Sequence, residues 1–456
     1  MPLAFETGVT TLGTLVLDNP NMTLPFNPDM TVPNDEQVLR PGAREAYPST
    51  ALRAGAEVQP RRGLSLRGLL DTGEIRPGSS LDPEVDGPTS YGLPLGEAAT
   101  EGLFVREAAV AFYGRRWGVD LGRFDVGVGE GLIYNDFGTG GSVSLDLARV
   151  DGDALRLDVD GVLVGRSFSE LRGRSSFWAA RLELPLSRFE HLSPFVAYYA
   201  DRDGALRDVM VSALAESYTN DNGSELALDL LHNAAGQLSI HGDLLYLGAD
   251  TLVLPIDGMS LRATGAVQAG RLRLALPDRS EDTLRVRGAG AQVEAHYGIG
   301  SRWDLGALGF GLSGDRAPQL DREDPRYAAF IAPAPLWAWT GLFFNGGLGQ
   351  GFYPSRASAA GVNGHGVLGA GPVVSWQGDR PSVEMRAIWL RAVADSPAFG
   401  GGGATYGVEV DLRNDWRLSD WATLAGELDM LFPGSYFPED DVALQFILLL
   451  DLHHEG

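Results

Sequence analysis

Cysteine and lysine are missing from the sequence. None of the 456 residues is cysteine, so the chain can form neither a disulfide nor a thiolate metal site. All 36 basic residues are arginine, and 60 acidic residues bring the formal net charge to −24. Because a strongly acidic chain repels the phosphates of DNA and RNA, nucleic acid is excluded as a partner.

The sequence also lacks long hydrophobic runs. The longest purely apolar run near the C-terminus is residues 446–450 (FILLL), whereas a membrane-spanning helix needs about 20 apolar residues. A helical membrane protein is therefore excluded. A β-barrel is not, because each of its strands needs only about 9–11 residues that alternate between lipid and lumen.

The N-terminus has no export signal of its own. Residues 1–5 (MPLAF) contain neither a basic segment nor an apolar core of signal-peptide length. A barrel of the bacterial outer membrane must be exported. We therefore take residue 1 to follow a signal peptide that has been removed.

What the sequence does contain is alternation of apolar and charged residues with a period of two. In residues 155–160, three aliphatic side chains share one face of an extended strand, and Arg156, Asp158 and Asp160 share the other. The same division recurs at residues 178–184, 237–246, 383–389, 406–413 and 442–452. Counting such segments gives about 18 to 20 strands. The pattern predicts an all-β fold, a closed antiparallel transmembrane β-barrel of about 18 strands (16–20), with a soluble all-β protein as the alternative fold.

The chain is predicted to divide into residues 1–50 and residues 51–456. Residues 1–50 would supply a first strand and a Pro/Asn-rich loop or plug, and residues 51–456 the barrel. Its clearest hairpin covers residues 103–147, where two alternating runs lead into a glycine-rich segment. We expect that segment to be an extracellular loop.

Short and long connections are expected to lie at opposite ends of the barrel. The short links are predicted at residues 59–62, 114–116, 151–153, 234–236 and 378–380. The longer connections are predicted at residues 18–50, 72–102, 129–141, 202–222, 346–363 and 433–441. Residues 315–333 break this order, because they are long where the strand count requires a tight turn. Either a strand is miscounted there or a periplasmic segment exists.

Tryptophans recur near the predicted strand ends. Such positions are typical of the aromatic girdles at a membrane interface, although they would also suit the core of a soluble β-sandwich. The residues concerned are Trp117, Trp303, Trp337, Trp339, Trp376, Trp389, Trp416 and Trp421.

Arginines on the charged faces of the strands are the candidate site residues. A planar guanidinium binds a carboxylate through two contacts, so arginines along a lumen could guide an anionic solute. Alternatively, they pair with neighbouring carboxylates and have only a structural role. The predicted substrate path consists of Arg106, Arg123, Arg156, Arg181, Arg262, Arg271, Arg273, Arg285, Arg287 and Arg386. Arg271 with Arg273 and Arg285 with Arg287 are favoured, because few acidic residues lie near them in the sequence.

No motif for catalysis, metal binding or a cofactor is present. The seven histidines lack metal-ligand spacing, and residues 127–131 (GVGEG) lack the Lys-Ser/Thr that a phosphate loop requires. His241 and Asp243 share a strand face, but no serine lies in a nucleophile elbow. A hydrolase would need His241 to meet a serine or an asparagine. We expect no catalytic residue, no metal, no cofactor and no enzymatic activity.

Two stretches resemble a known family. Residues 103–137, with Gly122-Arg123 before a glycine-rich loop, and residues 421–437, with a Pro-Gly-aromatic loop, are similar to the alginate-export-like family of outer-membrane barrels. The resemblance implies about 18 strands and an arginine-lined lumen that passes an acidic exopolysaccharide delivered by periplasmic partners. Arg123 matches a motif position of that family, and Arg106 is a further candidate.

The sequence thus predicts a channel in the bacterial outer membrane. It would export or pass an anionic polysaccharide or another polar solute, with membrane lipid and periplasmic export or envelope-complex proteins as partners. The alternative is a structural barrel that anchors an envelope complex. That alternative would be favoured if residues 18–50 and 72–102 plug the lumen.

Overall fold

The computed structural model describes residues 3–17, 45–71, 104–150, 153–164, 175–207, 209–210, 239–275, 282–316, 325–344, 357–361, 364–394, 403–437 and 442–455. Nearly all of them belong to β-strands. Within these ranges, no helix is long and apolar enough to cross a membrane.

Eighteen long strands form the wall of the molecule. They are β1 (Leu3–Leu17), β2 (Glu45–Arg61), β3 (Leu64–Asp71), β4 (Phe104–Tyr113), β5 (Trp117–Val128), β6 (Tyr134–Val150), β7 (Asp153–Val164), β8 (Ser176–Ser187), β9 (Glu190–Asp201), β10 (Ser239–Val253), β11 (Met259–Ala275), β12 (Asp282–Ile299), β13 (Trp303–Leu312), β17 (Val367–Gln377), β18 (Pro381–Arg391), β19 (Thr405–Ser419), β20 (Ala422–Pro433) and β21 (Ala443–Glu455). Three two-residue strands, β14 (Arg326–Tyr327), β15 (Ile331–Ala332) and β16 (Ser358–Ala359), lie in the connection between β13 and β17.

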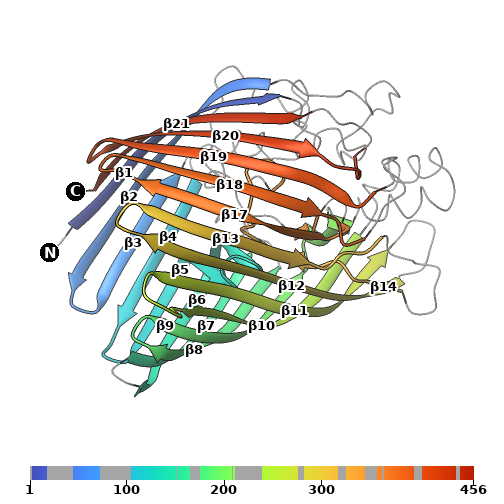
Figure 1. Cartoon of the computed structure of the whole chain (residues 1–456). Coiled ribbons are helices and arrows are strands. Elements are labelled where there is room, and N and C mark those ends of the chain that lie inside the picture. Colours follow the sequence, from blue (N-terminus) through green and yellow to red (C-terminus); the bar gives the residue numbers. More distant parts are fainter. Residues whose placement is uncertain are drawn as a thin grey trace.

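Each long strand pairs antiparallel with the long strands before and after it in the chain, and β21 pairs with β1. The succession of pairings therefore returns to its first strand, and Figure 1 shows the sheet curling around an interior. The prediction of an all-β fold with about 18 antiparallel strands is confirmed.

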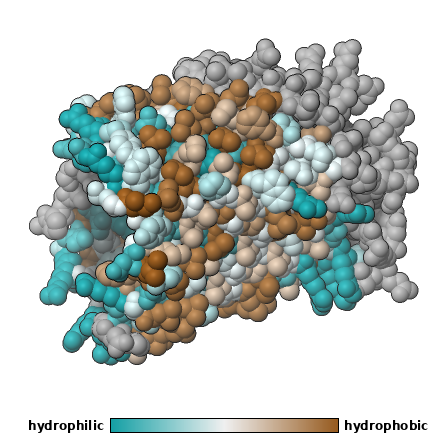
Figure 2. All heavy atoms as spheres, viewed as in Figure 1, coloured by the Kyte–Doolittle hydropathy of each residue, from teal (hydrophilic) through white to brown (hydrophobic). Residues whose placement is uncertain are grey.

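Alternation along each strand separates an outer face from an interior face. On β19, the outer-face residues Val408 and Leu412 are 39% and 40% exposed, whereas Glu409 between them is fully buried. A soluble protein would show the reverse arrangement. Figure 2 shows the exposed apolar residues as a broad brown band around the middle of the wall.

The two ends of the sheet differ in their connections. Tight turns join β2 to β3, β4 to β5, β12 to β13, β17 to β18 and β19 to β20 at the end where both chain termini lie (Figure 1). Residues 313–366 connect β13 to β17 at the other end, which we call the long-connection end. The irregularity predicted at residues 315–333 is thus explained by a miscounted strand. The link predicted at residues 234–236 lies outside the described residues.

Two predicted boundaries differ from the structure, whereas the predicted first strand exists. Residues 134–141 belong to β6 rather than to a loop, so the glycine-rich connection shrinks to residues 129–133. Strand β2 begins at Glu45, inside the segment predicted to be loop or plug. Strand β1 pairs with β2 and β21 and so belongs to the same sheet as the rest of the wall.

Candidate functional site

The interior holds a stretch of the β13–β17 connection. Residues 325–344, which we call the internal segment, include the fully buried side chains of Tyr327, Phe330, Ile331 and Leu342. Among the described residues, the internal segment contacts the wall at three separate places: strands β10 and β11, the β5–β6 turn, and strands β18 and β19. It therefore crosses the interior.

The first contact is with β10 and β11. The side-chain amide of Gln268 accepts a hydrogen bond from Ile331 N at 3.0 Å and donates one to Ile331 O at 2.8 Å. The Tyr246 hydroxyl donates a second hydrogen bond to Ile331 O at 2.8 Å. Since all three residues are buried, these bonds satisfy backbone groups that have no access to bulk water.

The second contact is with the short β5–β6 turn. Trp337 Nε1 donates to Leu132 O at 3.1 Å, and Leu336 N donates to Gly131 O at 2.8 Å. Gly131 has a φ of +79°, and a Cβ there would lie 2.9 Å from the Leu336 Cβ. The glycine-rich sequence thus allows the internal segment to approach the turn closely. The turn supports this segment rather than forming a long outer loop.

The third contact is with β18 and β19. The Glu409 carboxylate accepts hydrogen bonds from Leu342 N at 2.5 Å and Phe343 N at 3.0 Å, and Arg386 donates to Ala338 O at 2.9 Å. Asp411 accepts a further bond from Gly341 N at 3.3 Å. Strands β10, β5 and β19 are well separated in the order of pairing. The segment is therefore fixed to the wall on several sides.

Two tryptophans of the internal segment form an aromatic cluster with Phe310 of β13. Trp339 stacks on Phe310 with ring centroids 4.1 Å apart and donates from Nε1 to Gln292 Oε1 at 2.8 Å. Trp337 stacks on Trp339 at 6.1 Å. These two tryptophans are 7% and 3% exposed, so their predicted place in an interfacial girdle is wrong. Trp117, Trp303, Trp389, Trp416 and Trp421 are exposed on strands or at turns of the wall.

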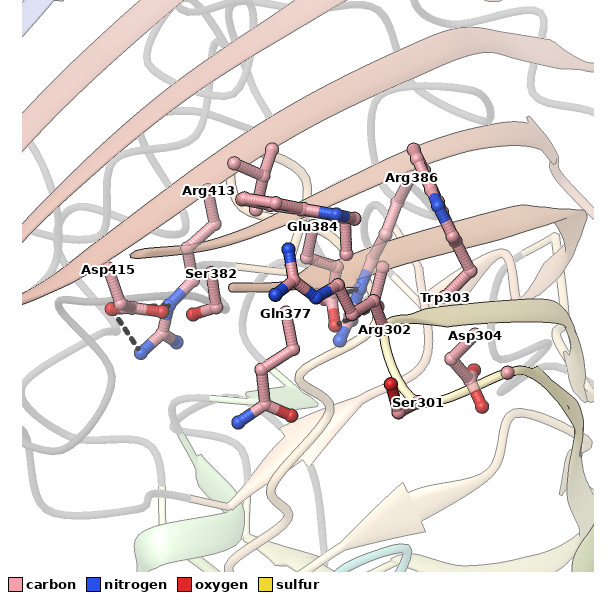
Figure 3. Close-up of a pocket in the computed structure, with 14 residues that line it drawn as sticks. Ser301, Arg302, Trp303, Asp304, Gln377, Ser382, Glu384, Arg386, Arg413 and Asp415 are labelled. Atoms are coloured by element: carbon pink, nitrogen blue, oxygen red, sulfur yellow. Dashed lines mark hydrogen bonds and ion pairs between the residues drawn. The ribbon is translucent and has the colours of Figure 1, made fainter. Parts of the chain in front are cut away.

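A polar cavity of about 410 Å³ lies near the tight-turn end, lined by residues of β13, β17, β18 and β19 and of the β12–β13 turn. Figure 3 shows its charged side chains, which come from β13, β18, β19 and the β12–β13 turn. Arg386 pairs with Glu384 at 2.8 Å, and Arg413 pairs with Asp415 at 3.0 Å. A second cavity of about 130 Å³ shares Glu384, Arg386 and Arg413 and reaches Gly341 of the internal segment. Together they form a polar lining that ends at the segment.

The described interior face is more acidic than basic. Strand alternation places seven arginines there, namely Arg67, Arg156, Arg181, Arg262, Arg386, Arg413 and Arg417. The carboxylates on the same face include Glu57, Glu107, Asp120, Asp136, Asp146, Asp158, Asp160, Glu183, Asp201, Asp250, Glu294, Asp304, Glu384, Glu409, Asp411, Asp415, Glu427, Asp429 and Asp451. The fixed charge of this lining is therefore negative.

Four of the predicted path residues lie on the interior face and have acidic neighbours. Arg156 and Arg181 both reach Asp158, at 2.7 and 3.4 Å. Arg386 pairs with Glu384, and Arg262 lies opposite Glu294 in the β11–β12 register. The ion pairs of Arg156, Arg181 and Arg386 are of the kind that the structural alternative predicts.

Arg106 lies near the long-connection end of β4, and Arg123 lies in the second half of β5. Arg123 is 3% exposed and interacts electrostatically with Asp136 and Tyr134. The Arg106 guanidinium lies 5.1 Å from the centre of the Phe137 ring. Gly122, which precedes Arg123, has a φ of +125°, and a Cβ there would meet Ala108 O. Local backbone geometry thus explains why a glycine precedes Arg123.

Arg271, Arg273, Arg285 and Arg287 lie on the outer face, so their predicted place in the lumen is wrong. Strand alternation puts them on the same face as exposed Val267 and Val293. Their neighbours on the opposite face point inward and are buried, namely Leu272, Leu274, Leu284 and Val286. The reason is local. At this end the interior is filled by the internal segment, so the apolar face of these strands points inward and the charged face outward.

His241 also lies on this outer face. Its Nε2 is 2.9 Å from Ser239 Oγ, but the Asp243 carboxylate accepts hydrogen bonds from Tyr198 and Arg202 instead of orienting the imidazole. His241 Nδ1 has no hydrogen-bond partner among the described atoms. The acid that a catalytic triad requires is therefore engaged elsewhere.

Known structures share this fold over the whole chain. OccK9 (OpdG) of Pseudomonas aeruginosa is 13% identical with a TM-score of 0.53, and the match covers 100% of this chain and 98% of that one. OccAB4 of Acinetobacter baumannii is 7% identical with a TM-score of 0.52, covering 100% and 99%. The outer membrane protein opdK of Pseudomonas aeruginosa is 11% identical with a TM-score of 0.51, covering 99% of both chains. At such identities the likeness shows the fold alone.

No family model matches the sequence, and no curated protein sequence matches it either. The resemblance to the alginate-export-like family is wrong, because the structures that match over the whole chain include Occ and Opd proteins such as OpdQ, OccAB4 and OccK9. The two stretches that suggested it are short glycine-rich and Pro-Gly-aromatic patterns. Patterns of that kind follow from strand and turn geometry that many barrels share.

Proposed function

We propose that the protein is a closed transmembrane β-barrel of the Gram-negative outer membrane and that it passes small polar solutes through its interior. The observation that carries this proposal is the inverted wall, in which apolar side chains are exposed and carboxylates are enclosed. The pairing of β21 with β1 leaves no open edge among the described long strands, as a membrane span of strands requires. The matched fold of outer-membrane channels supports the same location.

The solutes that suit this interior are small. The internal segment crosses it, the cavity beside the segment measures about 130 Å³, and the larger cavity nearer the tight-turn end measures about 410 Å³. An exopolysaccharide chain would need a continuous wide path. Solutes of the size of sugars, amino acids or simple organic ions would need only a narrow one.

Cations are favoured over anions. Carboxylates outnumber arginines on the described interior face, and the ion pairs of Arg156, Arg181, Arg386 and Arg413 offset their positive charge. A low-dielectric wall with a net negative lining raises the local concentration of cations. The route we propose runs past Arg386 and Arg413, through the two cavities at β18 and β19.

A barrel that anchors other envelope proteins, with its interior plugged, is a second candidate. The observation in its favour is the internal segment, which is hydrogen-bonded at three places on the wall. Such a barrel would carry no current. We further propose that the protein is not an enzyme, so it should release no product from a chromogenic ester.

Liposome swelling tests the channel and its charge preference together. Purified protein in phosphatidylcholine liposomes should admit ethanolammonium faster than glycerol, and glycerol faster than glycolate, since the three are similar in size and differ in charge. Phosphatidylcholine liposomes without protein are the blank. Swelling at the blank rate with all three solutes would favour the plugged barrel, and fastest entry of glycolate would reject the acidic-path proposal.

A further inference from the structure

Four arginines form a cluster on the outer face of β11 and β12, near the long-connection end. Arg271, Arg273, Arg285 and Arg287, which we call the outer arginine cluster, are all exposed there. No step of solute passage uses them, because the wall separates them from the interior. Their position requires another explanation.

The cluster begins where the exposed apolar band ends. On β11, Val267 is 56% exposed and Ala269 follows it on the same face, and the next outer-face residue is Arg271. On β10, Leu247 and Leu245 are 52% and 41% exposed before the outer face turns polar. Successive outer-face residues lie about 7 Å apart along a strand. The first guanidinium therefore lies within one side-chain length of the apolar band.

Like charges face each other within the cluster. Arg271 pairs directly with Arg285 across β11 and β12, and Arg287 pairs with Ala269 one position nearer the band. Paired strands lie about 4.8 Å apart, and like charges directly opposite are destabilising. The acidic residue on the described outer faces beside them is Asp243, which already binds Tyr198 at 2.7 Å and Arg202 at 2.5 Å. Arg271, Arg273 and Arg287 thus place three positive charges close together on the outer face, and such a concentration of charge suits an anion from outside the chain.

We propose that the outer arginine cluster binds the phosphate groups of lipid headgroups in the membrane leaflet at the long-connection end. This inference rests on the proposed membrane location. The headgroups of a bilayer begin where its apolar layer ends, which is the level of the cluster. The planar fork of arginine forms two parallel hydrogen bonds with a phosphate, and several forks side by side can hold a doubly charged one.

Native mass spectrometry of the protein in neutral detergent tests the proposal. The probes are dioleoyl phosphatidic acid, whose phosphate is a monoester, and dioleoyl phosphatidylcholine. The test variant is R271Q/R273Q/R287Q, and the matched control is R115Q/R116Q/R149Q, which removes the same charge from exposed positions elsewhere. Heat-modifiable migration on a gel verifies that each variant is folded, so failure of the barrel itself is recognised separately.

The wild type and the control should bind phosphatidic acid at least tenfold more tightly than phosphatidylcholine, and the test variant should lose most of that preference. Equal binding of both lipids by the wild type would overturn the proposal. Equal losses in the test variant and the control would show general charge attraction and would also overturn it. Displacement of phosphatidic acid by millimolar glycerol 3-phosphate would assign the cluster to a soluble phosphate compound instead of a lipid.

Discussion

Removing the Glu409 side chain should release the internal segment from β19. In Glu409→Ala, the backbone N–H groups of Leu342 and Phe343 lose the carboxylate oxygens that accept from them at 2.5 and 3.0 Å. An unsatisfied buried N–H costs about 1–3 kcal/mol. Since the neighbouring cavity of about 130 Å³ can admit water, we take the lower part of that range, about 2–3 kcal/mol for the pair.

A destabilisation of this size raises the released fraction of the segment about 30- to 160-fold. Single-channel recordings in a planar bilayer should therefore show a larger conductance level that is occupied far more often than in the wild type. Glu409→Gln should fall between the two, because its one remaining oxygen can accept only one of the two bonds while its NH2 group faces the other N–H.

Glu294→Ala is the matched control. Glu294 is an interior carboxylate on β12, 4.0 Å from His296, and its removal changes the charge of the interior by the same amount. The control should keep the wild-type conductance levels. If Glu409→Ala and Glu294→Ala behave alike, the Glu409 hydrogen bonds do not hold the segment, and the account of the third contact fails.

Three further changes test other parts of the structure. Gly131→Ala places a Cβ 2.9 Å from that of Leu336 at a φ of +79° and should lower the stability by about 1–2 kcal/mol, so the gel band of the folded protein should disappear at a lower temperature than in the wild type. Gly127→Ala is the control, because its Cβ would meet only Asn135 Oδ1, at 3.4 Å. Equal unfolding temperatures of the two variants would contradict the close approach. Gln268→Leu removes both hydrogen bonds to Ile331 and should lower the stability of the folded protein by about 2–4 kcal/mol. Unfolding at the same urea concentration as the wild type would disprove this. Asp158→Asn removes the shared partner of Arg156 and Arg181 and should raise the relative permeability of chloride in bilayer recordings, whereas an increase for potassium would be inconsistent with those ion pairs.

The strand pattern of the wall could be predicted from the sequence because it depends on local alternation. Residues 155–160 show why, since Leu157 and Val159 take the outer face and Asp158 and Asp160 the interior face, as the period of two requires. The tight turns at residues 114–116 and 378–380 were predictable for the same local reason.

The internal segment could not be predicted, because its residues imitate a strand of the wall. Trp337, Trp339 and the apolar residues around them suit a membrane-facing strand as well as a buried cluster. Only the pairing of β13 with β17 shows that the chain leaves the wall there. Because the internal segment makes the interior apolar at the long-connection end, the charged face of β11 points outward there. A rule that assigns every charged strand face to the interior therefore fails at Arg271 and Arg273.

The partners of charged side chains were also beyond sequence reasoning. Glu409 appears as one of many acidic residues in alternating strands, and nothing nearby in the chain indicates that it binds the backbone of residues 342 and 343. Contacts of this kind join residues more than 60 positions apart. Sequence periodicity carries no information at that distance.

The reversal potential in a salt gradient tests the central claim most directly. Wild-type protein in a planar bilayer, with a tenfold KCl gradient, should conduct, and the reversal potential should have the sign of a potassium-selective pore, because the described interior carries more carboxylates than arginines. A chloride-selective pore would contradict the assignment of charge to the interior face. A folded protein that conducts no current would contradict the channel itself.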